Sequence, residues 1–105
     1  MSIEYTKLAT LDDVKPGKML CVTHNGNRIL LANVDGTVYA CDEMCPHEEI
    51  SLGLGALQGT RLKCSLHGSR FDLLTGKVLD EPCEEDLKIY PVKIDGDAIC
   101  VATDS

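Results

Sequence analysis

The chain has 105 residues and a formal net charge of −7, from 17 acidic and 10 basic side chains. This length fits one compact domain, and 44% apolar residues are typical of a folded protein. The acidic balance disfavours a nucleic-acid partner, because the phosphate backbone would repel the protein. No stretch approaches the roughly 20 apolar residues of a membrane span, and MSIEYTKLAT lacks the features of a secretory signal. We therefore expect a single cytoplasmic domain over residues 1–105, without a nucleic-acid or membrane partner.

Short aliphatic and β-branched runs, separated by turn signals, occupy both ends of the chain. Thr10 is the candidate cap of one helical turn over residues 11–14, which must end before Pro16. Asn25-Gly26 and Asp35-Gly36 are strong hairpin signals, because a type I′ turn needs positive φ at both central residues. The strand-like runs are residues 19–23, 28–34, 37–40, 88–94 and 98–101. Their spacing predicts an all-β fold, an antiparallel sandwich or barrel.

Residues 42–83 interrupt this rhythm with a loop-like, glycine-rich pattern. A loop region of that length in so short a chain is expected only where it serves a function or is ordered by something else. Six cysteines in a reducing compartment favour metal binding or free thiols over disulfides. We therefore expect a core of strands with an inserted lobe over about residues 42–83 that a metal organises.

Two mixed ligand pairs lie in this region. Cys45-Pro46-His47 and Cys64-Ser65-Leu66-His67 each offer one thiolate and one imidazole, with 16 residues, 48–63, between the pairs. This spacing resembles the Rieske pattern, in which two thiolates hold one iron of a 2Fe–2S cluster and two imidazoles hold the other. Neutral imidazoles remove negative charge from the site, so the potential rises above that of an all-cysteine cluster. The predicted ligands are Cys45, His47, Cys64 and His67, and Gly68 is expected to let backbone N–H groups approach the sulfides.

A structural zinc site is the main alternative, since two Cys and two His form a tetrahedral zinc set. Zinc fingers usually group like ligands, with Cys-x-x-Cys before the histidines. Here both pairs are mixed, which favours the cluster. A zinc-binding interaction module without a redox role remains the alternative for these four residues.

At these motifs the sequence resembles the Rieske family, and within it the small ferredoxins of bacterial aromatic-ring-hydroxylating dioxygenase systems. The resemblance covers essentially the whole chain, through CPHEEISLGLG, CSLHGSRFDLLTGKV and YPVKIDGDAICV. It implies a Rieske-like fold with an inserted cluster-binding lobe, one 2Fe–2S cluster, and a proline loop at Pro82 that covers the cluster. It also implies a monomeric electron carrier, not an enzyme in itself. Such a carrier takes electrons from an NAD(P)H-dependent flavoprotein ferredoxin reductase to a terminal oxygenase in aromatic compound degradation.

Departures from the high-potential Rieske proteins are informative. Those proteins carry a disulfide between the ligand loops, and the matching positions here are Ile50 and Leu66. Ser69 matches their serine, but Phe71 stands where they have a tyrosine that hydrogen-bonds the cluster. Fewer hydrogen bonds to sulfur stabilise the reduced state less. The expected potential lies at the low end of the Rieske range, about −150 mV.

An enzymatic role is disfavoured by the histidine count. A mononuclear iron triad needs two histidines and a carboxylate, whereas only His24 remains outside the ligand pairs. A related alternative is the small Rieske subunit of an assimilatory nitrite reductase, which would be held tightly by its partner instead of shuttling.

The remaining cysteines and the acidic residues have plainer interpretations. Cys21 and Cys100 are expected as small buried residues of strands, Cys41 as a core thiol at a strand end, and His24 as an exposed loop residue; Cys83 has no assigned role. Two acidic groups border the lobe: Asp35, Asp42, Glu43, Glu48 and Glu49, and then Asp80, Glu81, Glu84, Glu85 and Asp86. They form either a docking rim for basic partners or a solvated face.

Overall fold

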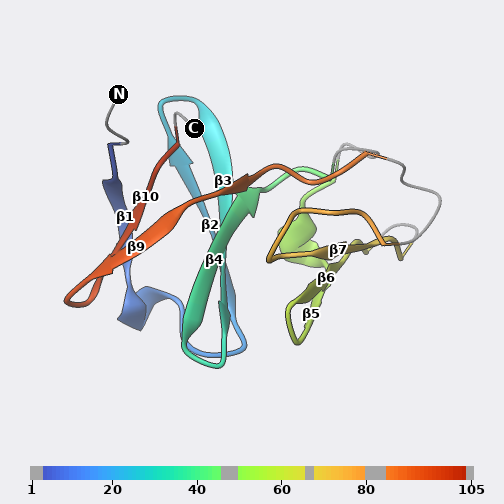
Figure 1. The fold of residues 1–105 in the computed structure, drawn as a ribbon, viewed down its shortest axis with the longest axis horizontal. Helices are drawn as coiled ribbons and strands as arrows, with labels where there is room; N and C mark the ends of the chain where they lie inside the picture. Colours follow the sequence, from blue (N-terminus) through green and yellow to red (C-terminus); the bar gives the residue numbers. More distant parts are fainter. Residues whose placement is uncertain (1–3, 46–49, 66–67, 80–84, 104–105) are drawn as a thin grey trace.

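Short antiparallel strands form three small sheets in the computed structural model, which describes residues 4–45, 50–65, 68–79 and 85–103 (Figure 1). The strand orders are β1-β10-β9, β2-β3-β4-β8 and β5-β6-β7. In chain order the elements are β1 Thr6–Thr10, the 3-10 turn η1 Leu11–Asp13, β2 Met19–His24, β3 Asn27–Val34, β4 Thr37–Asp42, the 3-10 turn η2 Leu52–Leu54, β5 Ala56–Gln58, β6 Arg61–Lys63, β7 Arg70–Asp72, β8 Ile89–Tyr90, β9 Val92–Asp95 and β10 Ala98–Val101. The expected antiparallel all-β fold is confirmed.

The predicted hairpins are present at the predicted turns. Asn25 and Gly26 join β2 to β3 with φ of 51° and 81°, and Asp35 and Gly36 join β3 to β4 with φ of 52° and 94°. Positive φ at both central residues is the type I′ conformation that matches the twist of the flanking strands. These turns fix the register of the central sheet, so that Val34 faces Thr37 in β4.

The helical turn after Thr10 is also confirmed, as the short η1. Asp13 accepts hydrogen bonds from the Thr10 backbone N–H (2.9 Å) and hydroxyl (3.1 Å), which lowers the pKa of its carboxyl. Among the residues placed by the structure, no helix is long and apolar enough to cross a membrane.

The run 88–94 differs from expectation, because two strands of different sheets share it. β8 pairs with β4 and β9 pairs with β10, with Pro91 between them. Proline has no backbone N–H to donate to a ladder, so the chain changes sheets at this residue. The N-terminal strand β1, which was not among the predicted runs, pairs with β10 and completes the β9–β10 sheet.

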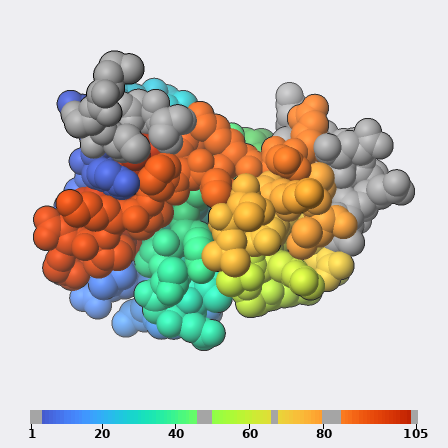
Figure 2. Space-filling model, in the orientation of Figure 1, coloured from blue at the N-terminus to red at the C-terminus, as the bar shows by residue number. Residues whose placement is uncertain are grey.

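The region expected to be loop-like contains a sheet of its own, with strands of three residues each. Leu62 of β6 faces Phe71 of β7, and both side chains are fully buried. In Figure 1 this β5–β7 sheet lies at the opposite side of the molecule from β1, β9 and β10, with the β2–β4 sheet between them. Figure 2 shows the same division on the surface, with yellow residues beside the green of β4 and the orange-red of the C-terminal strands.

Two buried clusters of apolar side chains meet at β3. Leu30 and Ala32 pack on the side of the β5–β7 sheet, whereas Ile29 and Leu31 pack on the side of β1 and β10. Successive side chains of a strand point to opposite faces. β3 therefore contributes to both cores, and the β5–β7 sheet is packed directly against the larger part of the protein.

Candidate metal centre

Cys45 lies just beyond β4, at the start of a short loop. Its backbone N–H donates to the carbonyl oxygen of Ile50 (2.9 Å), and Met44 pairs with Ser51 as an isolated antiparallel bridge. Its side chain is buried, with 5% of the residue exposed. The segments before and after residues 46–49 are thus paired in antiparallel fashion, with Cys45 at the end of the first.

A buried carboxylate sits at the base of this loop. Glu43 accepts two hydrogen bonds from Arg28, at 2.7 and 3.0 Å, and one from the Ser51 hydroxyl at 2.5 Å. Burial alone would raise the pKa of this carboxyl, but hydrogen bonds from Ser51, Cys21 and Arg28, together with the positive charge of Arg28, outweigh it. The pKa of Glu43 therefore lies below its usual range, and the side chain is ionised at neutral pH.

Cys64 begins the second loop, between β6 and β7. Its N–H donates to the Ser69 carbonyl oxygen (2.8 Å), and its own carbonyl oxygen accepts from the Gly68 N–H (3.1 Å). Gly68 has φ of 77°, a conformation that favours glycine. Its own N–H is therefore engaged by the Cys64 carbonyl oxygen, and the approach of other backbone N–H groups to the sulfides stays a prediction.

A third segment is held against the second loop. The Leu79 N–H donates to the carbonyl oxygen of Arg70 (2.8 Å), and Phe71 pairs with Val78. On the far side of residues 80–84, the Leu87 N–H donates to Gly76 (2.6 Å). Both ends of the segment that contains Pro82 are thereby attached beside the β6–β7 hairpin.

The thiols of the two ligand motifs, Cys45 and Cys64, fit a shared cluster. Cys45 and Cys64 belong to the same buried group of side chains, and each comes from a separate hairpin loop. Beside Cys64 is a cavity of about 450 Å³, which is lined by Leu54, Gly55, Ala56, Lys63, Cys64, Ser65 and Gly68. Thiolates are the protein ligands of iron–sulfur clusters, and small residues around them leave room for one. The residues present therefore fit a cluster bound between these two loops.

Several predicted residues lie outside the described part of the chain. These are the histidines of the two motifs, the proline-loop residues and part of the acidic groups: His47, His67, Pro82, Cys83, Glu48, Glu49, Asp80, Glu81 and Glu84. Leu66, one of the two positions that replace the disulfide cysteines, is also outside; the other, Ile50, is described and half-buried.

The other cysteines and His24 only partly follow expectation. Cys41 is fully buried, as predicted, but Cys21 is exposed and Cys100 is half-buried. Cys21 pairs with the buried Leu30 and its sulfur lies 3.9 Å from the Ser51 hydroxyl, but β2 is at an edge of its sheet, so the side chain stays exposed at the margin of the core. His24 is the last residue of β2 and is half-buried, not an exposed loop residue.

Three of the acidic residues that were predicted to border the lobe have partners within the protein. Glu43 is buried and ion-paired, and Asp42 accepts a hydrogen bond from the Tyr90 hydroxyl. Asp86 accepts from the Val78 N–H (3.0 Å). These three residues have structural partners, and of the described acidic residues Glu43 in particular does not form part of a docking surface.

The role of Glu43 was not predicted from the sequence, although a signal was present. With the turn at Asp35-Gly36, the strand register that pairs Ile29 with Asp42 also places Arg28 opposite Glu43. Opposite charges at facing positions of two antiparallel strands attract each other. The Arg28–Glu43 ion pair could therefore have been predicted from the sequence once the register of the β3–β4 hairpin was assigned.

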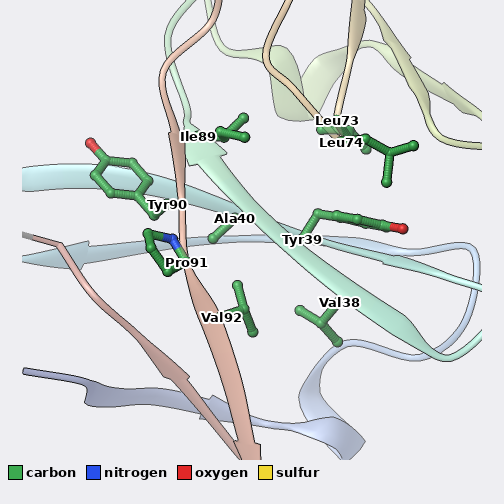
Figure 3. Close-up of a pocket in the computed structure, with 9 residues that line it drawn as sticks. All are labelled: Val38, Tyr39, Ala40, Leu73, Leu74, Ile89, Tyr90, Pro91 and Val92. Carbon is green, nitrogen blue, oxygen red and sulfur yellow. The ribbon is translucent and has the colours of Figure 1, made fainter. Parts of the chain in front are cut away.

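A larger cavity, of about 510 Å³, lies away from both thiols (Figure 3). Its walls come from β4, from the segment that includes β8 and β9, and from the turn after β7: Val38, Tyr39, Ala40, Leu73, Leu74, Ile89, Tyr90, Pro91 and Val92. None of these described lining residues carries a thiol, imidazole or carboxylate, so they offer no metal ligands.

The family model described as Rieske [2Fe-2S] domain matches residues 4–91. A ferredoxin component of naphthalene 1,2-dioxygenase/salicylate 5-hydroxylase systems from Ralstonia sp. is 41% identical, over 90% of this chain and 91% of that protein. The biphenyl dioxygenase ferredoxin subunit of Pseudomonas sp. (strain KKS102) is also 41% identical, over 92% and 90% of the two chains.

Solved structures agree with these relatives. The ferredoxin of carbazole 1,9a-dioxygenase from Nocardioides aromaticivorans IC177 superposes with a TM-score of 0.88 at 33% identity, covering 93% of this chain and 96% of that one. A ferredoxin chain in a complex with the reduced oxygenase of carbazole 1,9a-dioxygenase gives 0.87 at 28%, covering 93% and 92%. A putative nitrite reductase NADPH (small subunit) oxidoreductase protein gives 0.81 at 26%, covering 94% and 98%. With its two buried thiols in separate hairpin loops and a family match over most of its length, the chain belongs to the Rieske [2Fe-2S] domain family.

Proposed function

We propose that this chain is the ferredoxin component of an aromatic-ring dioxygenase system. It receives single electrons from an NAD(P)H-dependent flavoprotein reductase and passes them to a terminal oxygenase. The observation that carries the proposal is the pair of buried thiols, Cys45 and Cys64, at the starts of two hairpin loops. The ferredoxin components among its relatives, which match nine-tenths of the chain, support this role.

We assign Cys45, His47, Cys64 and His67 as the ligands of one Rieske-type 2Fe–2S cluster. When bound, the cluster accepts and releases one electron at a potential set by its two imidazole ligands. The assignment is supported by the chemistry of the two motifs and by the burial of both thiols. Residues 1–105 act as a single domain in this proposal, with a cluster-binding lobe over about residues 42–83.

Apolar side chains pack around Cys45 and Cys64 and limit the access of solvent to their sulfur atoms. Leu52, Leu62 and Phe71 are fully buried in the same group as the two thiols. A dry, apolar surround strengthens charge effects at the site and restricts water. The small residues beside Cys64 leave the cavity open to a partner surface there.

The proposed partners follow from the same role. A ferredoxin of similar fold occurs in a complex with an oxygenase, which supports an oxygenase as electron acceptor here. The reductase is inferred as the electron donor that such a system needs. A carrier that exchanges between two partners is expected to be a monomer and to work in the cytoplasm beside them.

A small Rieske subunit of an assimilatory nitrite reductase is the second candidate. It is supported by the TM-score of 0.81 to a putative protein of that kind. Such a subunit would stay bound to its enzyme during purification. Size-exclusion chromatography of the chain expressed together with candidate partners separates a free carrier from a fixed subunit.

Reconstitution tests the main proposal. Product formation from an aromatic substrate by candidate reductase and oxygenase components should require the protein and should stop when it is left out. Cys64→Ser should lose the iron, the inorganic sulfide and the activity, while the matched thiol variant Cys100→Ser keeps all three. If anaerobically prepared protein holds zinc and no sulfide, the proposal is wrong and the zinc-binding alternative stands.

A further inference from the structure

The loop that begins at Cys45 is closed by side chains as well as by backbone. The Cys45 N–H donates to the Ile50 carbonyl oxygen at 2.9 Å, and the Leu52 N–H donates to the Glu43 carbonyl oxygen at 2.7 Å. Across the same base, the Ser51 hydroxyl donates to the Glu43 carboxylate at 2.5 Å. The two ends of the loop are therefore joined by three hydrogen bonds, one of which has an ionised acceptor and belongs to the stronger class.

The Glu43 carboxylate also attaches the base of the loop to the central sheet. Arg28 of β3 donates to both carboxylate oxygens, through Nε at 2.7 Å and a terminal nitrogen at 3.0 Å. The Glu43 backbone N–H donates to the Arg28 carbonyl oxygen at 3.1 Å. β3 is paired along its length with β2 on one side and β4 on the other. The base of the loop is thus connected to a central strand that is hydrogen-bonded on both of its edges.

The carboxylate of this ion pair is buried, whereas its guanidinium partner is exposed. The Glu43 side chain is 5% exposed, whereas that of Arg28 is 56% exposed. A buried charge that loses its partner is strongly penalised, yet an intact buried ion pair rarely stabilises a fold more than apolar packing would. Stability alone therefore does not account for a carboxylate at this position. A polar network with all its partners does specify one arrangement of the groups that it joins.

We propose that Arg28, Glu43 and Ser51 form a positioning network, which fixes the first ligand loop on β3 and thereby the geometry of cluster ligation from that loop. The inference rests on the proposed function, because it takes Cys45 and His47 as ligands. The three residues are positioning residues, since they act through the loop that carries the ligands. Substitution of these residues should change the rate of iron release and the resonance lines of the cluster more than it changes the stability of the fold.

The test uses the holoprotein and the variants Ser51→Ala, Glu43→Gln and Arg28→Lys. Each should release iron to excess chelator about tenfold faster and lower the hydrogen-exchange protection of the Cys45 and Leu52 amides about tenfold, which corresponds to 1.4 kcal/mol. The electron paramagnetic resonance lines of the reduced cluster should broaden or shift. Ser51→Thr keeps the hydroxyl and should restore the wild-type values. Arg28→Lys leaves the buried carboxylate a charge partner but removes the two-pronged contact, so it covers the case in which Glu43→Gln does not fold.

Asn33→Ala is the matched control, because Asn33 is a buried polar residue of the same strand. Its side chain donates to the Val14 carbonyl oxygen and accepts from the Gly36 N–H, both at 2.8 Å. This variant should lower the melting temperature and leave the resonance lines and the iron release unchanged. If Asn33→Ala and Ser51→Ala change them equally, or if neither does, the positioning network is wrong. A wild-type protein without iron and sulfide would instead refute the proposed function.

Discussion

The carbonyl oxygen of Lys63 lies 1.9 Å from the position that a Cβ atom would occupy on Gly55. Gly55 follows η2, and its N–H donates to the Leu52 carbonyl oxygen at 3.0 Å. Lys63 is the last residue of β6 and precedes Cys64. The absence of a side chain at Gly55 is therefore what lets η2 lie against the strand that leads into the second ligand loop.

Gly55→Ala should consequently displace the end of β6 and lower the cluster content. We expect a loss of at least about 3 kcal/mol in the free energy of unfolding, since a clash with backbone relaxes poorly. The φ of Gly55 is −85°, which alanine adopts without strain, so the clash alone is tested. Urea denaturation and iron analysis measure the two effects.

Gly59→Ala is the control for this prediction. Gly59 has φ of 63°, and no atom lies within 4 Å of the place where its Cβ would be, so alanine meets backbone strain but no clash. It should cost about 1–2 kcal/mol and leave the iron content unchanged. Equal losses in the two variants would contradict the importance of the close approach.

The reduction potential is expected at about −150 mV. Phe71 is fully buried within the group of side chains that includes both thiols, and it offers no hydroxyl to them. Phe71→Tyr should raise the potential, because a hydrogen bond toward sulfur stabilises the reduced state. Phe71→Leu should lower stability without raising the potential. Redox titration followed by visible absorption measures all three proteins, and a clearly positive wild-type potential would refute the expectation.

The Cys41 thiol should resist alkylation in the folded protein. Burial, and to a lesser degree the negative charge of Asp42, raises the pKa of this thiol from 9.0 to about 12. The folded state therefore binds the proton more tightly than the unfolded state does. The stabilisation is fully present below pH 9 and is lost as the pH rises from 9 toward 12.

Iodoacetamide labelling with mass spectrometry tests this prediction. At pH 9 Cys41 should react in urea but not in the native protein, and the exposed Cys21 should react in both. Native labelling of Cys41 at the rate seen in urea would show that the thiol is not held in its protonated, buried form.

Electrostatic docking should depend on the acidic residues that flank the first ligand motif and Pro82 in the sequence. Charge reversal of Glu48, Glu49, Glu84 and Glu85 is expected to slow electron transfer to the oxygenase and to flatten its dependence on salt, because steering weakens. Reversal of Asp35, in the β3–β4 turn, is the control and should have little effect. Unchanged rates and salt dependence in the fourfold variant would leave these residues as a solvated face.

Local signals carried most of the correct predictions. The turns at Asn25-Gly26 and Asp35-Gly36 depend on backbone preferences of the residues themselves, so the sequence identifies them directly. The ligand motifs are similarly local, and the structure buries Cys45 and Cys64, but the assignment of the two pairs as ligands stays a prediction. The fold of the central sheet followed from these features.

Features that depend on distant contacts were harder to predict. The three-residue strands β5–β7 are too short to show a period, and they form because Leu62 and Phe71 bury each other. The change of sheet at Pro91 has a local cause, but its destination is set by packing. Cys21 looks like any small strand residue, and only its place at an edge of the sheet exposes it.

The two faces of β3 are each covered by a different buried cluster of side chains. Leu30 faces the side with Cys45 and Cys64, and Leu31 faces the side with Ile99. Neither half can come apart without uncovering one face of this strand, so they cannot melt independently. Heating should therefore unfold the half with β1, β9 and β10, which contains none of the proposed ligands, in the same cooperative step in which the colour of the cluster is lost.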